Sequence, residues 1–215
     1  MSGSGTAKSK NQHWVPKFYL RYFATAESIR SKRPRVRIID KDLRDRDGLV
    51  LSAEKVCGKR YLYSPVDSNG NRDWSIDEFL DKLESDAGTY WPTLNEAFPD
   101  LSQPSLREPL AQFVGAMHLR NVAVFDLVKQ TMVLRDRLYG GPNAEVLARK
   151  GPDGLDPTDP SRFFAQVLRT RVGPIAESFS RMTWSVLCTS AEAFVTSDQP
   201  VTFIQGGIGP KPGVV

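Results

Sequence analysis

Three long runs of apolar residues recur at three- and four-residue spacing, and they require much of the core to be helical. The runs cover residues 75–94, 105–137 and 161–182. Residues at this spacing fall on one face of a helix, and that face must be buried against another element. The second run contains no Pro after Pro109, so its pattern predicts one unbroken helix.

Polar residues in front of two of these runs predict where the helices begin. Ser75 is followed three residues later by Glu78, which is the spacing of a capping box, where each side chain satisfies a free main-chain N–H of the other residue. Ser161 or Asp159 stands at the start of the third run, and either side chain can accept hydrogen bonds from the first N–H groups of a helix.

Shorter apolar segments predict strands. Residues 36–39 and 49–51 flank a polar turn, as in an antiparallel hairpin with a long loop. Further short strands are expected at residues 60–63, 184–188, 193–196 and 201–203. We therefore expect an α+β fold, with long helices packed on a small, mainly antiparallel sheet that combines the hairpin with the late strands.

Length and composition fit a single globular unit. The 215 residues are 40% hydrophobic and 25% charged, which are ordinary values for one domain. We expect that domain to span residues 13–205, between disordered tails at residues 1–12 and 206–215. Cys57 and Cys188 show no paired spacing, and no signal peptide or membrane-spanning run is present. These features predict a cytoplasmic protein without a membrane partner.

Residues 13–23, called the aromatic segment below, combine five aromatic residues with His13 and Pro16. Proline suits the first turn of a helix and favours extended geometry in the residue before it. A short helix over residues 16–24 would be apolar on all sides, so we expect it to be buried. His13 is a candidate general base or metal ligand, because imidazole titrates near neutrality. The alternative is a structural histidine that caps the helix.

Two motifs resemble those of a bacterial family catalogued as domain of unknown function 4238. The aromatic segment has the pattern H-x-V-P-x-F-Y-L-x-x-F, and residues 197–200 have the pattern S-D-x-P. The resemblance spans residues 13–203 and implies that Glu84 lies on an acidic helix and Arg120 on a helix that carries the family's arginine. The chain departs from the family directly after Arg120, where Asn121 and Val122 replace a small residue and a proline.

The resemblance implies one site for residues that are distant in sequence, namely His13, Glu84, Arg120, Ser197 and Asp198. A desolvated Glu84 needs a partner or a raised pKa, and Arg120 can supply a permanent charge and two parallel N–H donors. The pair is either an acid with its orienting arginine or a structural ion pair. Ser197 and Asp198 either face the His13 site from a loop or are ordinary turn residues.

Charge is unevenly distributed along the chain. Residues 1–60 hold 15 Lys or Arg and 6 Asp or Glu, a net charge of +9, and the remainder hold 14 against 19, a net charge of −5. Residues 30–46 are rich in basic side chains, so a polyanion such as nucleic acid is a candidate partner there. The expected phosphate contacts are Arg33, Arg35 and Arg37. The alternative is a solvated hairpin, since Asp40, Asp42, Asp45 and Asp47 interleave with the bases.

Two classes of function follow. The first is a hydrolase, with or without a divalent metal, that acts on a phosphodiester or nucleic acid. His13, Glu84 and Asp198 would be its metal ligands or acid–base groups. The second is a non-enzymatic module that binds nucleic acid through its phosphates, or binds a protein. No glycine loop for phosphate, paired-cysteine metal site or nucleophile elbow occurs in the sequence. The spatial arrangement of the candidate residues must therefore decide between the classes.

Overall fold

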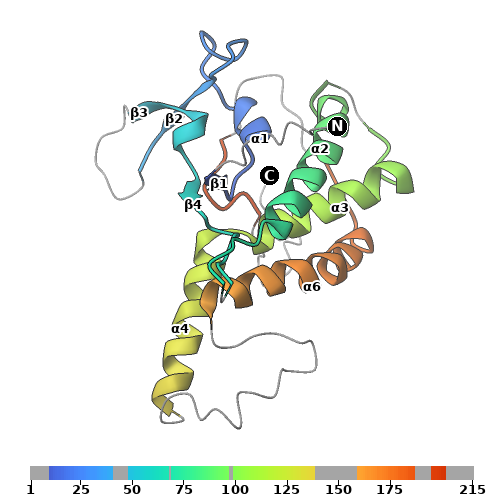
Figure 1. Cartoon of the computed structure of the whole chain (residues 1–215). Helices are drawn as coiled ribbons and strands as arrows, with labels where there is room; N and C mark the ends of the chain where they lie inside the picture. Colours follow the sequence, from blue (N-terminus) through green and yellow to red (C-terminus); the bar gives the residue numbers. More distant parts are fainter. Residues whose placement is uncertain are drawn as a thin grey trace, which may run out of the picture.

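The computed structural model describes residues 10–40, 48–67, 69–96, 99–138, 159–186 and 195–201. Within these ranges four long helices form the body, and small antiparallel sheets lie on one side of it (Figure 1). The helices are α2 (Ser75–Glu96), α3 (Pro104–Leu119), α4 (Val122–Leu138) and α6 (Pro160–Ser180). This arrangement confirms the predicted helix-rich α+β class. None of the described helices is both long and apolar enough to cross a bilayer.

The α3 helix is central, because it packs along α6 and also against α2 (Figure 1). Gly115 allows the close approach of α3 to α6, since a Cβ at this position would lie 3.4 Å from main-chain atoms of Val172 and Ala176. Burial of apolar side chains between the helices is the main favourable term that holds them together. The core includes Leu80, Ala116, Leu119, Phe125, Phe164 and Leu168.

The prediction of one helix over residues 105–137 is wrong, because the chain turns at Arg120 and Asn121. Arg120 ends α3 with φ −83° and ψ 4°, and α4 begins directly after Asn121. The Asn121 side chain accepts a hydrogen bond from the Val124 N–H at 2.9 Å and donates one to the His118 carbonyl at 2.7 Å. Asparagine is a favoured N-cap residue, so one side chain ends the first helix and starts the second.

The other helix starts lie close to their predicted positions. The α2 helix begins at Ser75, but the Asp73 carboxylate accepts the hydrogen bond from the Ser75 N–H at 2.9 Å, so this cap lies two residues before the predicted one. At α6 the Asp159 carboxylate accepts hydrogen bonds from the N–H groups of Ser161 and Arg162. That contact confirms Asp159 as the cap.

The first sheet is the predicted hairpin. Strand β2 (Arg35–Ile38) pairs antiparallel with β3 (Leu49–Ser52), and Val36 lies opposite Leu51. Val36 is buried, whereas Arg35 and Arg37 on either side of it are exposed. Alternation of this kind is expected of a strand with one buried face.

The second sheet was not predicted. Strand β1 (Asn11–His13) pairs antiparallel with β4 (Gly58–Arg60), and His13 lies opposite Gly58. The expected strand at residues 60–63 is therefore shifted, because the chain leaves the sheet at Tyr61, which has a φ of 56°. Positive φ is uncommon for an aromatic residue and marks a turn.

Strand β1 includes residues 11 and 12, which the sequence placed in a disordered tail. Gln12 is 3% exposed, and its side chain accepts a hydrogen bond from the Tyr63 N–H at 2.7 Å and donates one to the Ser64 hydroxyl at 2.6 Å. A buried amide that makes both bonds is satisfied, so Gln12 fastens β1 to the loop after β4. Residues 1–9 and the predicted tail at 206–215 lie outside the described residues.

The predicted late strands are wrong for the part of the chain that the structure describes. Residues 184–186, 195–196 and 201 are not in strands, and the rest of these predicted strands lies outside the described residues. Residues 195–201, called the late segment below, instead contact the aromatic segment through side chains. The predicted common sheet does not form because β2 pairs with β3 and β1 with β4.

Helix α1 (Lys17–Arg21) is shorter than predicted, and Leu20 is its fully buried residue. Phe18 and Tyr19 pack edge-on against Trp91 of α2, with ring centroids 5.9 and 5.3 Å apart. Tyr22 is 36% exposed. The expectation of burial on all sides is therefore wrong, because the helix packs against β2 and α2 while Lys17 and Arg21 are exposed.

Candidate functional site

Arg120 lies at the centre of the candidate site and is 1% exposed. Its Nη1 makes an ion pair with Glu84 Oε1 at 2.6 Å, and its Nε donates a hydrogen bond to the Trp14 carbonyl at 3.0 Å. The Tyr63 hydroxyl donates a hydrogen bond to the Arg120 carbonyl at 2.8 Å. A buried charge is tolerated only when it is paired. The arginine thereby links α2, α3, the aromatic segment and the loop after β4.

The second terminal nitrogen of the same guanidinium, Nη2, differs from Nη1 and Nε in its hydrogen bonding. Arg120 Nη2 is buried and has no hydrogen-bond partner among the residues that the structure describes. Buried donors without a partner are rare and each calls for an explanation. One explanation consistent with the chemistry is an acceptor oxygen supplied by a ligand, because guanidinium groups bind carboxylate and phosphate oxygens well.

His13 ends β1 and is half-buried. Its Nε2 lies 3.2 Å from the Glu54 carbonyl, and a carbonyl only accepts, so Nε2 carries the proton and Nδ1 has the free lone pair. Burial lowers the pKa of His13 below 6.5, and the charges of Lys17 and Arg120 lower it further. The ring is therefore neutral near pH 7 and able to act as a base.

Sequence reasoning missed Lys17 and Asp81, whose charges act on the same group of residues. Asp81 lies at the surface one turn before Glu84 on α2, and partial burial together with the Glu84 charge raises the pKa of Asp81. The Lys17 and Arg120 charges oppose that rise. The signals were present, because Asp81 precedes Glu84 by three positions on one helix face and Lys17 follows His13 by four residues.

The late segment contacts the aromatic segment, which confirms the predicted proximity. The Trp14 indole Nε1–H donates a hydrogen bond to the Asp198 carbonyl at 3.1 Å, across 184 positions of sequence. The Tyr19 hydroxyl and the Thr196 hydroxyl lie 3.0 Å apart. Trp14 and Tyr19 can hold the late segment through these contacts, because each combines a large packing surface with one polar tip.

The side chains of Ser197 and Asp198 have roles other than direct contact with His13. The Ser197 hydroxyl accepts a hydrogen bond from the Gln199 N–H at 3.1 Å, as in a turn. The Asp198 residue is exposed. Burial raises the pKa of the Cys57 thiol to about 11, and the negative charge of Asp198 contributes to that rise. The structure therefore brings the Asp198 main chain to Trp14 and its carboxylate near Cys57.

A metal site was a further expectation for His13, Glu84 and Asp198. Among the described residues, no three His, Cys, Asp or Glu side chains lie close enough together to hold one ion. The groups whose charges act on one another here are one imidazole, two cations and two carboxylates, of which Glu84 is paired with Arg120. This donor set fits acid–base chemistry on an anion better than it fits a metal ion.

The three arginines of the hairpin lie apart from this set of contacts. Arg33, Arg35 and Arg37 are exposed, and the Arg35 guanidinium donates a hydrogen bond to the Val50 carbonyl at 3.0 Å. Residues 41–47 of the predicted basic region lie outside the described residues. In the part that is described, the strand alternation places Arg35 and Arg37 on one exposed face.

Comparison with known proteins identifies a family but no characterised relative. A model of the family described as protein of unknown function (DUF4238) matches residues 11–212. None of the curated proteins and none of the solved structures compared with the chain matches it.

Proposed function

Because the chain belongs to the family of proteins of unknown function DUF4238, we propose its activity from the site itself: a hydrolase that acts on a phosphodiester or a similar anionic ester. One observation carries the proposal. The Arg120 guanidinium, whose buried Nη2 has no hydrogen-bond partner in the described part of the chain, lies close enough to His13 for its charge to help lower the pKa of that histidine. An anion-binding group and a general base are the two parts that hydrolysis of such an ester needs.

Each residue has a role in this scheme. Arg120 Nη2 and Lys17 bind the anionic oxygens of the ester, and Glu84 holds the guanidinium in place. His13 Nδ1 takes a proton from water, and the water oxygen attacks phosphorus. The bond from phosphorus to the leaving oxygen then breaks, and the leaving oxygen takes a proton from solvent water.

The late segment completes the site in this proposal. Its contact with Trp14 holds residues 196–198 against the aromatic segment, where they cover the residues that adjoin His13. Exclusion of water strengthens the electrostatic contacts to a bound anion. A reducing, cytoplasmic setting belongs to the same proposal, since the Cys57 thiol is free.

The test uses the purified chain and a chromogenic phosphodiester, followed by assays of RNA and DNA oligonucleotides. His13→Gln and Arg120→Lys should each lower kcat by about 10²- to 10⁴-fold. Arg181→Lys is the matched control, because Arg181 is an exposed arginine paired with Glu177, and it should leave kcat unchanged. Circular dichroism shows whether each variant is folded. Equal activity of a folded His13→Gln variant and the wild type would exclude the proposed base.

The exposed face of β2 favours a second candidate function, which is nucleic-acid binding by the hairpin. Arg35 and Arg37 point away from the buried Val36, and phosphate contacts of this type weaken steeply as salt rises. Charge reversal of Arg33, Arg35 and Arg37 should weaken binding of all oligonucleotide sequences equally, because phosphate contacts do not read bases. Fluorescence anisotropy at several salt concentrations measures this. An affinity that is unchanged by the three charge reversals would mean that the hairpin arginines are solvated surface and do not contact the nucleic acid.

A further inference from the structure

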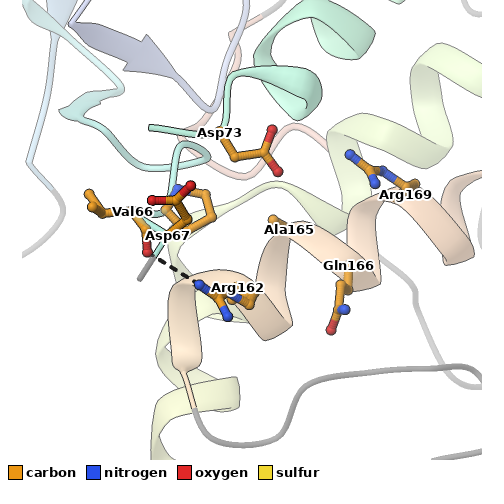
Figure 2. A pocket seen from close by; sticks show the side chains of 8 residues that line it. Val66, Asp67, Asp73, Arg162, Ala165, Gln166 and Arg169 are labelled. Carbon is orange, nitrogen blue, oxygen red and sulfur yellow. Dashed lines mark hydrogen bonds between the residues drawn. The ribbon is translucent and has the colours of Figure 1, made fainter. Parts of the chain in front are cut away.

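A pocket lies away from the His13 and Arg120 site and shares no residue with it. It has a volume of about 340 Å³ and is formed between α6 and the loop that precedes α2 (Figure 2). That volume is at the lower end of the range of about 300–1,000 Å³ for small-molecule sites. The pocket therefore suits a ligand smaller than a nucleotide or a folded chain.

The floor of the pocket is apolar and its rim is charged. Ala165 and Pro65 are buried and form the floor. Arg162 and Arg169 extend from α6, seven residues apart on the same face as Ala165, and Figure 2 shows their guanidinium groups at the two ends of the pocket. A small side chain between two long ones leaves the space that the ligand would fill.

Two carboxylates face these arginines from the loop. Asp67 and Asp73 line the pocket (Figure 2). Hydrogen bonds from Asn71 and Asn69 to Asp67, and from Ser75 to Asp73, lower the pKa of these two carboxyl groups, and the charges of the α6 arginines lower it further. The Arg162 guanidinium donates a hydrogen bond to the Val66 carbonyl at 3.3 Å, and the Arg169 guanidinium contacts the Ser75 hydroxyl. Hydrogen bonds thus hold both cations near their ends of the pocket.

The balance of charge restricts the ligand. Two cations and two anions line one small space, so a simple anion would meet both carboxylates and a simple cation both guanidinium groups. A neutral ligand would displace water from four ionised groups without returning a charge, which is costly. A ligand with one charge of each sign avoids both penalties.

From this arrangement we propose that the pocket binds a small zwitterion, namely a free amino acid or a dipeptide. The ligand carboxylate binds the guanidinium of Arg169, since a guanidinium carries five N–H donors and its contact with Ser75 is compatible with a second partner. The ligand ammonium binds the Asp67 carboxylate at the other end. The ligand side chain lies on Ala165 and Pro65.

Isothermal titration calorimetry of the full chain tests the proposal with the natural L-amino acids, a set of Gly-X and X-Gly dipeptides, and their N-acetylated and C-amidated forms. At least one free amino acid or dipeptide should bind with a Kd of about 1 mM or tighter. Acetylation of its amine or amidation of its carboxylate should each weaken binding by about tenfold or more. Glucose serves as the neutral comparison and should not bind.

Variants assign the site. Arg169→Gln should weaken binding of the free ligand by about tenfold or more but leave the affinity of its C-amidated form unchanged. Asp67→Asn should also weaken binding of the free ligand by about tenfold or more, and it should leave the affinity of the N-acetylated form unchanged. Arg181→Gln is the exposed control and should leave the affinity unchanged. The proposal is overturned if no free ligand binds, if capped ligands or glucose bind equally well, or if both pocket variants bind like the wild type. Hydrolytic activity plays no part in these measurements, so their outcome is independent of the proposed function.

Discussion

Arg120 and Glu84 form an ion pair in which one side chain is buried and the other is partly exposed. The guanidinium is 1% exposed and the Glu84 side chain 25% exposed. Removal of one partner from a buried pair is strongly destabilising, because the other charge is left uncompensated, whereas replacement of both by apolar residues is often tolerated.

This contrast gives the first prediction. Glu84→Ala should lower the free energy of unfolding by about 3 kcal/mol, the lower end of the range for broken buried pairs, because Glu84 is partly exposed. The double variant Glu84→Leu, Arg120→Met should recover most of that loss but remain inactive. Urea titration measures the stability, and the ester assay measures the activity. A loss below about 1 kcal/mol, the value typical of surface pairs, would mean that solvent already screens the pair.

The second prediction concerns the protonation of His13. Its folded-state pKa lies below the ordinary value of 6.5, so the folded protein resists protonation more than the unfolded chain does. The contribution of His13 to stability is full above pH 6.5 and is lost as pH falls from 6.5 through the folded-state pKa. Hydrolysis that uses neutral His13 as base should fall over the same acidic window.

An NMR titration of the imidazole protons checks this second prediction. The chain has two histidines, and the spectrum of His13→Gln assigns the signal of His13. A midpoint at or above 6.5 would contradict the argument from burial and neighbouring cations. If the prediction holds, the activity of the wild type should fall at acidic pH with the same midpoint as the NMR titration of His13.

At the scale of elements, Gly58 in β4 limits how β1 and β4 can approach each other. A Cβ at Gly58 would lie 2.7 Å from Asn11 Nδ2 and 3.1 Å from His13 Nε2. Both distances are shorter than ordinary van der Waals contact, so a larger residue must displace the β1 side chains. Gly88 in α2 is the opposite case, because an added Cβ would have no neighbour within 4 Å.

The pair of glycines gives the third prediction. Gly58→Ala should lower the free energy of unfolding by about 1–3 kcal/mol through overpacking and should also lower activity, because His13 moves. Gly88→Ala should raise the free energy of unfolding by about 0.4–1 kcal/mol, since alanine favours the helix and restricts the unfolded chain. Thermal unfolding of both variants is sufficient. Equal effects of the two substitutions would show that the close approach at Gly58 relaxes without cost.

Elements with a strong local pattern could be predicted, and those set by a distant partner could not. The starts of α2 and α6 and the β2–β3 hairpin follow from periodicity and turn residues close in sequence. The β1–β4 pair joins segments about 47 positions apart, and Gln12 and His13 in β1 show no alternation of apolar residues. The break between α3 and α4 depends on one capping residue, Asn121. In the sequence this weak signal is hidden by the long apolar pattern that continues on both sides of it.

At the scale of the whole molecule, the two sequence motifs meet although they stand near opposite ends of the chain. The ion pair of Glu84 with Arg120 and the approach of residues 196–198 to the aromatic segment agree with expectation. The missing parts of the prediction were Lys17 and Asp81. Their spacing from His13 and Glu84 is visible in the sequence, but the effect of their charges on the site depends on the fold. Spatial neighbours alone reveal their shared environment.

The contact between Tyr19 and Thr196 also has a consequence for the order of folding. It closes a loop of 177 positions, and the entropy of loop closure makes such contacts late events. We therefore expect α2, α3 and α6 to pack first and the late segment to dock afterwards. A residue whose contacts form after the transition state changes the unfolding rate and leaves the folding rate nearly unaltered.

The fourth prediction follows from this order. Tyr19→Phe removes one hydroxyl and should lower the free energy of unfolding by about 1 kcal/mol, the value of a typical hydrogen bond. In stopped-flow experiments nearly all of that loss should appear as about fivefold faster unfolding. A folding rate that falls by the same factor would place the docking step at the start of folding. If unfolding alone accelerates, the hydrogen bond acts as a latch whose release is the first step by which the native chain opens.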